Sequence, residues 1–222
     1  PYTDWTGKLS RYDQAVIRWA VDAVGAADIA DHPVMELSDG QRQKLMIARA
    51  LAQESDLILL DEPTAFLDLP RRAEIMRLLR HLAAETGRAI LLSTHDLDLA
   101  LRSADTFWLM SGGQVQSGAP EDLVLSGAFE AAFHGEGVIF DRATGSFSVE
   151  RSSSKDVTVI GEGIFYTWTC RALKRAGYRL TSDSPVEIHV VEDEWFINGE
   201  SYHSIQSLLA ALPHVEPLYD FA

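Results

Sequence analysis

The feature that most constrains this chain is a pentapeptide, LSDGQ at residues 37–41, which stands immediately before a strong helical pattern. From residue 42 to residue 53, apolar side chains recur at the spacing of one helix face, so the pentapeptide forms the first turn of that helix. Such a turn offers a serine hydroxyl, a glycine backbone and the free N–H groups of a helix N-terminus, which together make a site for phosphate. The sequence therefore predicts an anion-binding turn here.

A second pattern, the apolar run LILL at residues 57–60, ends in the carboxylate pair Asp61 and Glu62. A run this short, closed by Pro63, is typical of a fully buried parallel strand whose C-terminal end carries the acids. In an open parallel sheet, ligands bind at the carboxyl ends of the strands. We therefore expect the two carboxylates to face a ligand. The plainer alternative is an acidic pair that ends a strand and has no chemistry.

Two further patterns follow along the chain at fitting distances. Residues 65–68 (AFLD) continue from the acidic pair, and residues 89–94 (AILLST) form a second apolar strand that leads directly into His95. Between them, Pro70 lies where a helix would begin and Gly87 lies just beyond its end. Strands that alternate with helices in this way indicate an α/β fold with a parallel sheet.

In order, these four patterns resemble the signature loop, the Walker B strand, the D-loop and the switch-histidine loop of ABC-type ATPases. The resemblance implies that Asp61 holds the Mg²⁺ shell, that Glu62 polarises the attacking water and that His95 contacts the γ-phosphate. A metal that bridges the phosphates neutralises developing charge, while a nearby carboxylate positions or deprotonates the nucleophile. ATP and Mg²⁺ are therefore the expected cofactors.

The resemblance also assigns nucleotide contacts to residues that do not serve their own subunit. Ser38, Asp39, Gly40 and Gln41 would close over the γ-phosphate of ATP held by a second subunit, and Asp68 would report on that opposite protomer. The implied active unit is a head-to-tail homodimer in which each nucleotide site is composite.

The chain departs from the family pattern in several places. Phe66 stands where the D-loop often carries a small residue. The P-loop pattern G-x-x-x-x-G-K-[ST], which would cradle the phosphates and supply a lysine, occurs nowhere in the sequence, since Gly7-Lys8 is followed by Leu9. The glutamine loop expected before the helical subdomain is absent as well. We therefore expect these residues to be the C-terminal part of a longer ATPase and to be inactive by themselves.

Charge and composition limit the remaining function classes. The chain carries a formal net charge of −14, and both residues 1–150 and residues 151–222 are acidic, so a sequence-independent grip on nucleic acid is not expected. No apolar run approaches the ~18 residues that a membrane helix requires, so any membrane role depends on partner subunits. The single cysteine, Cys170, excludes an internal disulfide framework and fits a reducing cytosol.

A polar linker at residues 151–154 divides the chain. Residues 1–150 are expected to be the C-terminal portion of an ABC ATPase domain, with the helical subdomain and signature in 1–53 and the Walker B and switch part in 54–150. Residues 155–222 follow the order strand, helix, three strands and helix, which predicts a small α+β accessory domain. The expected fold class is thus α/β: part of a P-loop NTPase parallel sheet with a helical subdomain, plus this accessory domain.

An aromatic tail with Phe129, Phe133, Phe140 and Phe147 resembles that of ATPase subunits that import iron–siderophore complexes, haem or cobalamin. The leading hypothesis is an ATP-hydrolysing importer subunit, peripheral on the cytoplasmic face of the bacterial inner membrane, with transmembrane permease subunits as partners. Two alternatives stay open. A non-transport ABC ATPase of the DNA-repair or chromosome-organising kind would carry long heptad stretches, which do not appear around the signature. A degenerate, non-catalytic regulatory module would fit the missing P-loop.

Overall fold

The computed structural model describes residues 8–133, 138–142, 145–149 and 155–213. The chain divides into two compact units: unit 1 comprises Pro1–Ala132 with Asp141–Ser146, and unit 2 comprises Phe133–Phe140 with Phe147–Ala222. Each unit has a buried apolar core of its own. The predicted linker at residues 151–154 lies outside the described residues.

Unit 1 begins with two helices, α1 (Arg11–Ala23) and α2 (Asp39–Leu51), which are separated by the short 3₁₀ turns η1 (Ala27–Ile29) and η2 (Val34–Glu36). Both helices start at a capping box, with Ser10 as the N-cap of α1 and Ser38 as the N-cap of α2. In each box the serine oxygen accepts the backbone N–H of the third helical residue, whose side chain bonds back to the N-cap N–H. The predicted start of α2 is confirmed.

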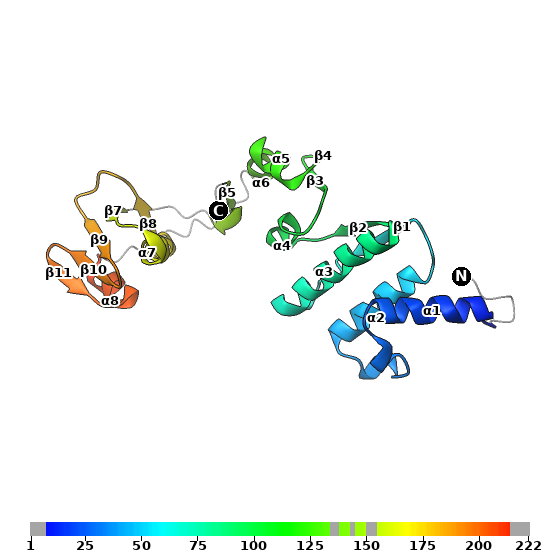
Figure 1. The fold of residues 1–222 in the computed structure, drawn as a ribbon. Coiled ribbons are helices and arrows are strands. Elements are labelled where there is room, and N and C mark those ends of the chain that lie inside the picture. Colours follow the sequence, from blue (N-terminus) through cyan, green and yellow to red (C-terminus); the bar gives the residue numbers. More distant parts are fainter. Residues whose placement is uncertain (1–7, 134–137, 143–144, 150–154, 214–222) are drawn as a thin grey trace. The chain divides into compact units, whose positions relative to one another are not determined.

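Two strands of unit 1 run parallel, as the sequence predicted. The prediction that residues 57–60 are fully buried is wrong, because Leu57 and Leu59 are 49% and 66% exposed and Ile58 is the fully buried side chain of this run. β1 (Leu57–Asp61) pairs with β2 (Ala89–Ser93) in a register that places Asp61 opposite Ser93. The crossover between them is α3 (Leu69–Thr86), which Asp68 caps at its start and Gly87 ends with a left-handed φ of 67°. A glycine adopts this conformation without the steric cost that a side chain brings. After β2 comes α4 (Leu97–Leu101), capped by Asp96 (Figure 1).

The core of unit 1 joins α1, α2, β1 and α3. Ile47 and Leu51 of α2, Ile58 of β1, and Ile75 and Leu82 of α3 are at most 3% exposed. Each such side chain contributes roughly 1.5–3 kcal/mol when it leaves water. Because one packed cluster holds these elements, it also fixes where the first turn of α2 and the last residue of β1 lie.

The next strand does not extend the parallel sheet. β3 (Phe107–Ser111) pairs with β4 (Gln114–Gly118) as an antiparallel hairpin, closed by Gly112 and Gly113 at positive φ. The parallel sheet in the described part of unit 1 therefore has two strands. Beyond it lie α5 (Pro120–Leu125), α6 (Ala128–Phe133), and the paired strands β5 (Val138–Asp141) and β6 (Ser146–Val149). The sequence had indicated only a small packed tail there.

Unit 2 contains a five-stranded mixed sheet in the order β11-β10-β9-β7-β8. Its elements are β7 (Lys155–Ile160), α7 (Gly163–Arg175), β8 (Tyr178–Leu180), β9 (Glu187–Val191), β10 (Glu194–Ile197), β11 (Glu200–Tyr202) and α8 (Ile205–Ala211). β7 runs parallel to both β8 and β9, whereas β9, β10 and β11 form an antiparallel meander. Val157, Leu173, Ile188 and Leu208 are fully buried and link the sheet to both helices.

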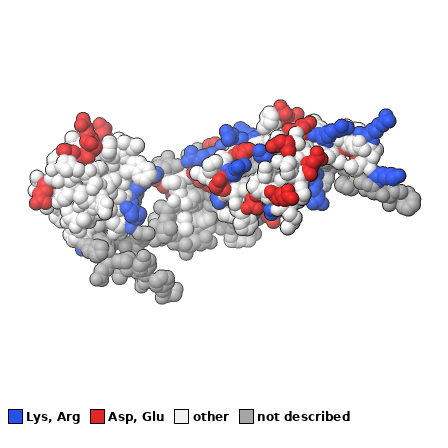
Figure 2. All heavy atoms as spheres, turned by 90° about the horizontal axis from the view of Figure 1, so that it is seen from below, with Lys and Arg blue, Asp and Glu red and all other residues white. Residues whose placement is uncertain are grey.

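The charged side chains of unit 1 are mixed rather than segregated. In the view of Figure 2, acidic and basic groups alternate over the described residues of this unit. Several of these groups form short-range pairs, such as Arg102 with Asp98 at 3.0 Å. An arrangement of this kind keeps a protein soluble but gives little directional field.

Candidate functional site

The carboxyl ends of β1 and β2 bring three polar side chains together. Ser93 Oγ donates a 2.5 Å hydrogen bond to Asp61 Oδ1. Ser93 Oγ also accepts a 3.0 Å hydrogen bond from the backbone N–H of Glu62. The parallel register makes this contact possible, because Asp61 and Ser93 are direct partners across the strand pair. One hydroxyl thus fixes both the orientation of a carboxylate and the path of the chain just beyond it.

Glu62 and His95 face one another at this edge. His95 Nδ1 lies 3.2 Å from Glu62 Oε1, and the two side chains are 70% and 47% exposed. The Glu62 backbone has a φ of 43°, a left-handed conformation that is uncommon for a residue other than glycine. Backbone outliers of this kind cluster at functional sites, where the surrounding structure holds them in place. The pair offers an open, oriented carboxylate that can accept a proton from a bound water.

The segment after Glu62 presents two unusual features in succession. Phe66 has a φ of 63° and a side chain that is 94% exposed. Asp68 is the N-cap of α3, and its Oδ1 accepts the backbone N–H of Arg71 at 3.0 Å. The carboxylate predicted to contact a second protomer is therefore already used in part to start a helix.

The pentapeptide forms the first turn of α2, as predicted. Ser38 Oγ accepts the backbone N–H of Gln41 at 3.4 Å, and Gln41 Oε1 accepts both the Ser38 N–H at 2.9 Å and its hydroxyl at 3.0 Å. Asp39 Oδ1 lies 3.6 Å from Arg42 Nη1, and the Asp39 side chain is 64% exposed. The turn combines serine, free helix N–H groups and glycine, which are the features of an anion site.

Gly40 is buried, yet the fold itself does not require a glycine there. A Cβ at this position would meet the nearest heavy atoms, Cδ and Nη1 of Arg71, at 3.6 Å, which is ordinary van der Waals contact. Its φ is not positive either. A side chain at Gly40 would therefore pack against Arg71 without strain.

The predicted residues form two separate groups in the described structure. Asp61, Glu62 and His95 are linked to one another or through Ser93. Residues 38–41 form a second group, and none of the hydrogen bonds or ion pairs found among the described residues joins their side chains to the first group. Asp68 caps α3 and belongs to neither.

The residues at the strand ends fit a magnesium ion better than a metal held by protein alone. No group of three or more His, Cys, Asp or Glu side chains in the described residues is placed to hold a metal ion. Magnesium characteristically takes one or two carboxylates from the protein, with phosphate oxygens and waters completing its shell. Asp61, oriented by the Ser93 hydroxyl, is a donor of that kind.

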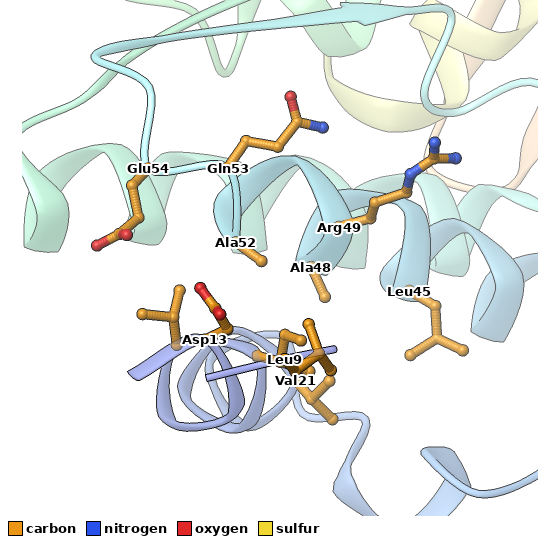
Figure 3. Close-up of a pocket in the computed structure, with 11 residues that line it drawn as sticks. Leu9, Asp13, Val21, Leu45, Ala48, Arg49, Ala52, Gln53 and Glu54 are labelled. Atoms are coloured by element: carbon orange, nitrogen blue, oxygen red, sulfur yellow. The ribbon is translucent and has the colours of Figure 1, made fainter. Parts of the chain in front are cut away.

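A cavity lies elsewhere, between α1 and α2 (Figure 3). It has a volume of about 650 Å³, and its walls carry apolar side chains with a few charged ones. The lining residues are Leu9, Asp13, Val16, Ile17, Val21, Leu45, Ala48, Arg49, Ala52, Gln53 and Glu54. None of the predicted site residues is among them.

Two site residues were not predicted from the sequence. Ser93 was treated only as part of a strand, although the pairing of two parallel strands of equal length would have placed it opposite Asp61. The Arg72 side chain donates hydrogen bonds to the Leu67 carbonyl and to the Asp96 carboxylate. The contact with Asp96 forms only when α3 packs beside the loop that follows β2. No local sequence signal identifies that second contact.

Comparison with known proteins places the chain in a class. Residues 5–65 match the family model described as ABC transporter, and residues 154–213 match the one described as Iron ABC transporter C-terminal domain. The chain belongs to the ABC transporter ATPase family, and its fold is of the α/β P-loop NTPase type. None of its described helices combines the length and apolar character needed to cross a lipid bilayer.

Several similar proteins are named as ATP-binding proteins of import systems. The chain is 44% identical over 115 residues to the iron(3+)-hydroxamate import ATP-binding protein FhuC of Bacillus subtilis, covering 52% of this chain and 43% of that protein. It is 36% identical over 184 residues to the cobalamin import ATP-binding protein BtuD of Halobacterium salinarum, covering 79% and 46%. An ABC transporter ATP-binding protein of Methanocaldococcus jannaschii is 38% identical over 157 residues, with coverage of 70% and 54%. The chain thus spans about half the length of the curated relatives it matches.

Solved structures agree on the fold. An ABC transporter described as of metal-chelate type, in an inward-facing conformation, superposes with a TM-score of 0.56 at 32% identity, covering 60% of this chain and 53% of that one. The ADP conformation of the ATP-binding cassette MJ1267 gives a TM-score of 0.52 at 26% identity, covering 60% and 54%.

Proposed function

We propose that this chain supplies the hydrolytic residues of an ABC importer ATPase, while a P-loop outside its 222 residues supplies the phosphate cradle. The observation that carries the proposal is the contact of 3.2 Å between His95 Nδ1 and Glu62 Oε1 at the end of a parallel strand pair. An ATPase that contains this chain together with a P-loop is called the assembled ATPase below.

Within the assembled ATPase, Glu62 is the residue that orients and deprotonates the attacking water. His95 contacts the Glu62 carboxylate, and it would hydrogen-bond a γ-phosphate oxygen of the bound nucleotide. Asp61 would hold Mg²⁺, and a bound Mg²⁺ would neutralise the charge that develops on the phosphate. Without a P-loop the same residues have no cradle for the nucleotide, so the chain alone is inactive.

The first turn of α2 serves a nucleotide held by a second subunit. Ser38, Asp39, Gly40 and Gln41 present a hydroxyl and the N–H groups of a helix start, which are groups that bind phosphate. Two subunits in head-to-tail arrangement would complete two such composite sites. Asp68, the N-cap of α3, lies on the segment that would contact the partner.

The import class follows from the names of the relatives, which include iron(3+)-hydroxamate and cobalamin import. We infer that the cargo is a chelated metal of this kind, such as an iron–siderophore complex or a cobalamin, passed through transmembrane permease subunits. The chain would work as a peripheral subunit on the cytoplasmic face of the membrane. Residues 155–222 would form an accessory domain that tunes the ATPase and makes no catalytic contact.

The experiment that tests the proposed function is Glu62→Gln in the assembled ATPase. The substitution keeps the shape of the side chain but removes the base, so ATP should still bind while steady hydrolysis is nearly abolished. Glu85→Gln, an exposed carboxylate on α3 paired with His81, is the matched control and should hydrolyse ATP normally. Wild-type turnover by Glu62→Gln would place the catalytic base elsewhere.

A further inference from the structure

One arginine of α3 bridges the two loops that carry Asp68 and His95. Arg72 Nε donates a 2.7 Å hydrogen bond to the carbonyl oxygen of Leu67, and its Nη1 donates a 3.1 Å bond to Asp96 Oδ2. The side chains of Arg72 and Asp96 are only 34% and 18% exposed. Because this charge-assisted pair is largely shielded from water, it is stronger and better ordered than a surface ion pair.

Each end of the bridge lies beside a residue of the candidate site. Leu67 immediately precedes Asp68, so its carbonyl belongs to the D-loop just before the α3 cap. Asp96 immediately follows His95 and also caps α4, through a 3.2 Å bond from the Leu99 N–H to its other carboxylate oxygen. Asp96 therefore divides its two oxygens between a helix start and the arginine.

The geometry of the guanidinium makes this bridge directional. Its donors lie in one rigid plane, so Arg72 holds the Leu67 carbonyl and the Asp96 carboxylate in a fixed relation to one another. A lysine at this position has a single ammonium centre on a flexible stem, and it can keep the charge pair without holding both partners in register. A displacement of the D-loop backbone is thus passed to the loop that carries His95.

We propose that Arg72 is a positioning residue that couples the D-loop to the switch histidine. Contact of a second subunit with residues 66–68 sets the position of His95, and hence of the Glu62 carboxylate, through the Arg72 bridge. The inference rests on the proposed function for its consequence in hydrolysis, but the coupling itself is a property of this chain.

The coupling is tested first in the chain alone, by NMR of the His95 imidazole. Phe66→Pro cannot keep the native φ of 63° and so displaces the D-loop backbone. We expect it to shift the His95 signals in the wild-type background and to lose most of that shift in Arg72→Gln. Arg80→Gln is the matched control, because Arg80 is an exposed arginine on the same helix that pairs with Asp105. If Phe66→Pro shifts His95 equally with and without Arg72, the coupling is refuted. Should Arg72→Gln not fold, Asp96→Asn removes the charge pair while keeping the α4 cap and side-chain volume.

The consequence is tested in the assembled ATPase. Arg72→Gln should lower kcat between about tenfold and about 100-fold, since small misplacement of catalytic groups has effects of this size, with the KM for ATP unchanged. Compared with Arg72→Gln, Arg72→Lys should recover the stability of the protein but little of the lost kcat. If Arg72 had a purely structural role, stability and kcat would recover together. A normal kcat in both variants would overturn the proposal. A wild-type assembly that fails to hydrolyse ATP would instead refute the proposed function, and the NMR result would still decide the coupling.

Discussion

Ser93 Oγ lies 2.5 Å from Asp61 Oδ1 and also accepts the N–H of Glu62, so a residue of one strand organises the end of its neighbour. The two carboxylates of the acidic pair consequently have different surroundings. Asp61 is oriented by a hydroxyl, whereas Glu62 is oriented by its own strained backbone and by His95. Different surroundings are what allow adjacent carboxylates to take different roles, one toward a metal and one toward water.

Ser93→Ala should disturb both carboxylates at once. We expect the free energy of unfolding to fall by about 1 kcal/mol, because two hydrogen bonds are lost at a partly exposed position, and hydrolysis in the assembled ATPase to fall as well. Ser93→Thr keeps the hydroxyl and should restore most of both. Ser55→Ala, which removes a bond to the Leu57 carbonyl at the other end of β1, is the control. Equal hydrolysis in Ser93→Ala and Ser55→Ala would show that the Ser93 contact is dispensable.

Phe66→Asn should stabilise the chain. The native φ of 63° is costly for phenylalanine but tolerated by asparagine, and the exposed ring has almost no packing to lose. The expected gain in the free energy of unfolding is about 1 kcal/mol, measured by urea denaturation. Phe66→Ala keeps the strain and should change stability little. A clear loss of stability in Phe66→Ala would mean that the ring packs against the chain after all.

Acid should weaken the contact between α2 and α3. Lys44 Nζ lies 2.6 Å from Glu74 Oε1, and this hydrogen bond lowers the pKa of the Glu74 carboxyl below its ordinary value of 4.5. A carboxyl whose folded pKa is depressed stabilises the fold above its ordinary pKa, and this stabilisation is lost as the pH falls through the folded value. The contribution is small, about 0.5 kcal/mol, since the Glu74 side chain is 39% exposed.

The measurement for this prediction is urea denaturation at several pH values below about 5. Glu74→Gln should give a shallower loss of stability with falling pH than the wild type. Glu85→Gln, an exposed change on the same helix, should follow the wild type. Parallel pH curves for the wild type and Glu74→Gln would contradict the assignment.

Thr169→Val should destabilise unit 2 more than its small change in shape suggests. Trp195 Nε1 donates a 2.5 Å bond to Thr169 Oγ1 inside the core, and valine leaves that N–H without this acceptor. A buried donor without a partner costs about 1–3 kcal/mol. Thr167→Val on the same helix removes an exposed hydroxyl bonded to the Gly163 carbonyl and should have little effect. The comparison uses urea denaturation followed by circular dichroism, and equal losses would exclude a special role for the buried bond.

Deletion of residues 150–222 from the assembled ATPase should leave ATP binding and basal hydrolysis in place. The core around Val157, Ile188 and Leu208 belongs to unit 2 alone, so the remaining residues keep their own buried cluster. We expect the response of hydrolysis to partner or cargo to change. Loss of nucleotide binding in a truncated protein that remains folded would contradict an accessory role for this region.

Local signals in the sequence were sufficient for most elements. The first turn of α2, the glycine after α3 and the parallel pairing of β1 with β2 are each specified within a few residues, and these predictions are confirmed. The three-residue strand β11 was missed because so short a segment owes its conformation to pairing with β10. The sequence of β3 likewise does not determine that it pairs with β4 in a sheet separate from β1 and β2, because this pairing depends on contacts with other segments.

The candidate site divides in the same way. Asp61, Glu62 and His95 follow apolar strands directly, so their location at one sheet edge could be predicted from pattern alone. The contacts of Ser93 and Arg72 could not, because they depend on strand register and on the path of α3 between two loops. The roles of residues 38–41 and Asp68 stay predictions, since their partner is a second subunit.

In the capping box of α2, Gln41 and a bound anion would compete for the same Ser38 hydroxyl. Ser38 Oγ has one proton to give, and Gln41 Oε1 currently receives it at 3.0 Å. A phosphate oxygen that binds this hydroxyl must displace the glutamine, so the helix exchanges one acceptor for another at nearly constant hydrogen-bond count. In the free chain, Gln41 thus behaves as an internal surrogate for the ligand. An incoming anion must form a stronger hydrogen bond with the Ser38 hydroxyl than the Gln41 amide oxygen does. That amide oxygen is neutral, so its hydrogen bond is weaker and easier to replace than one to a carboxylate at the same position would be.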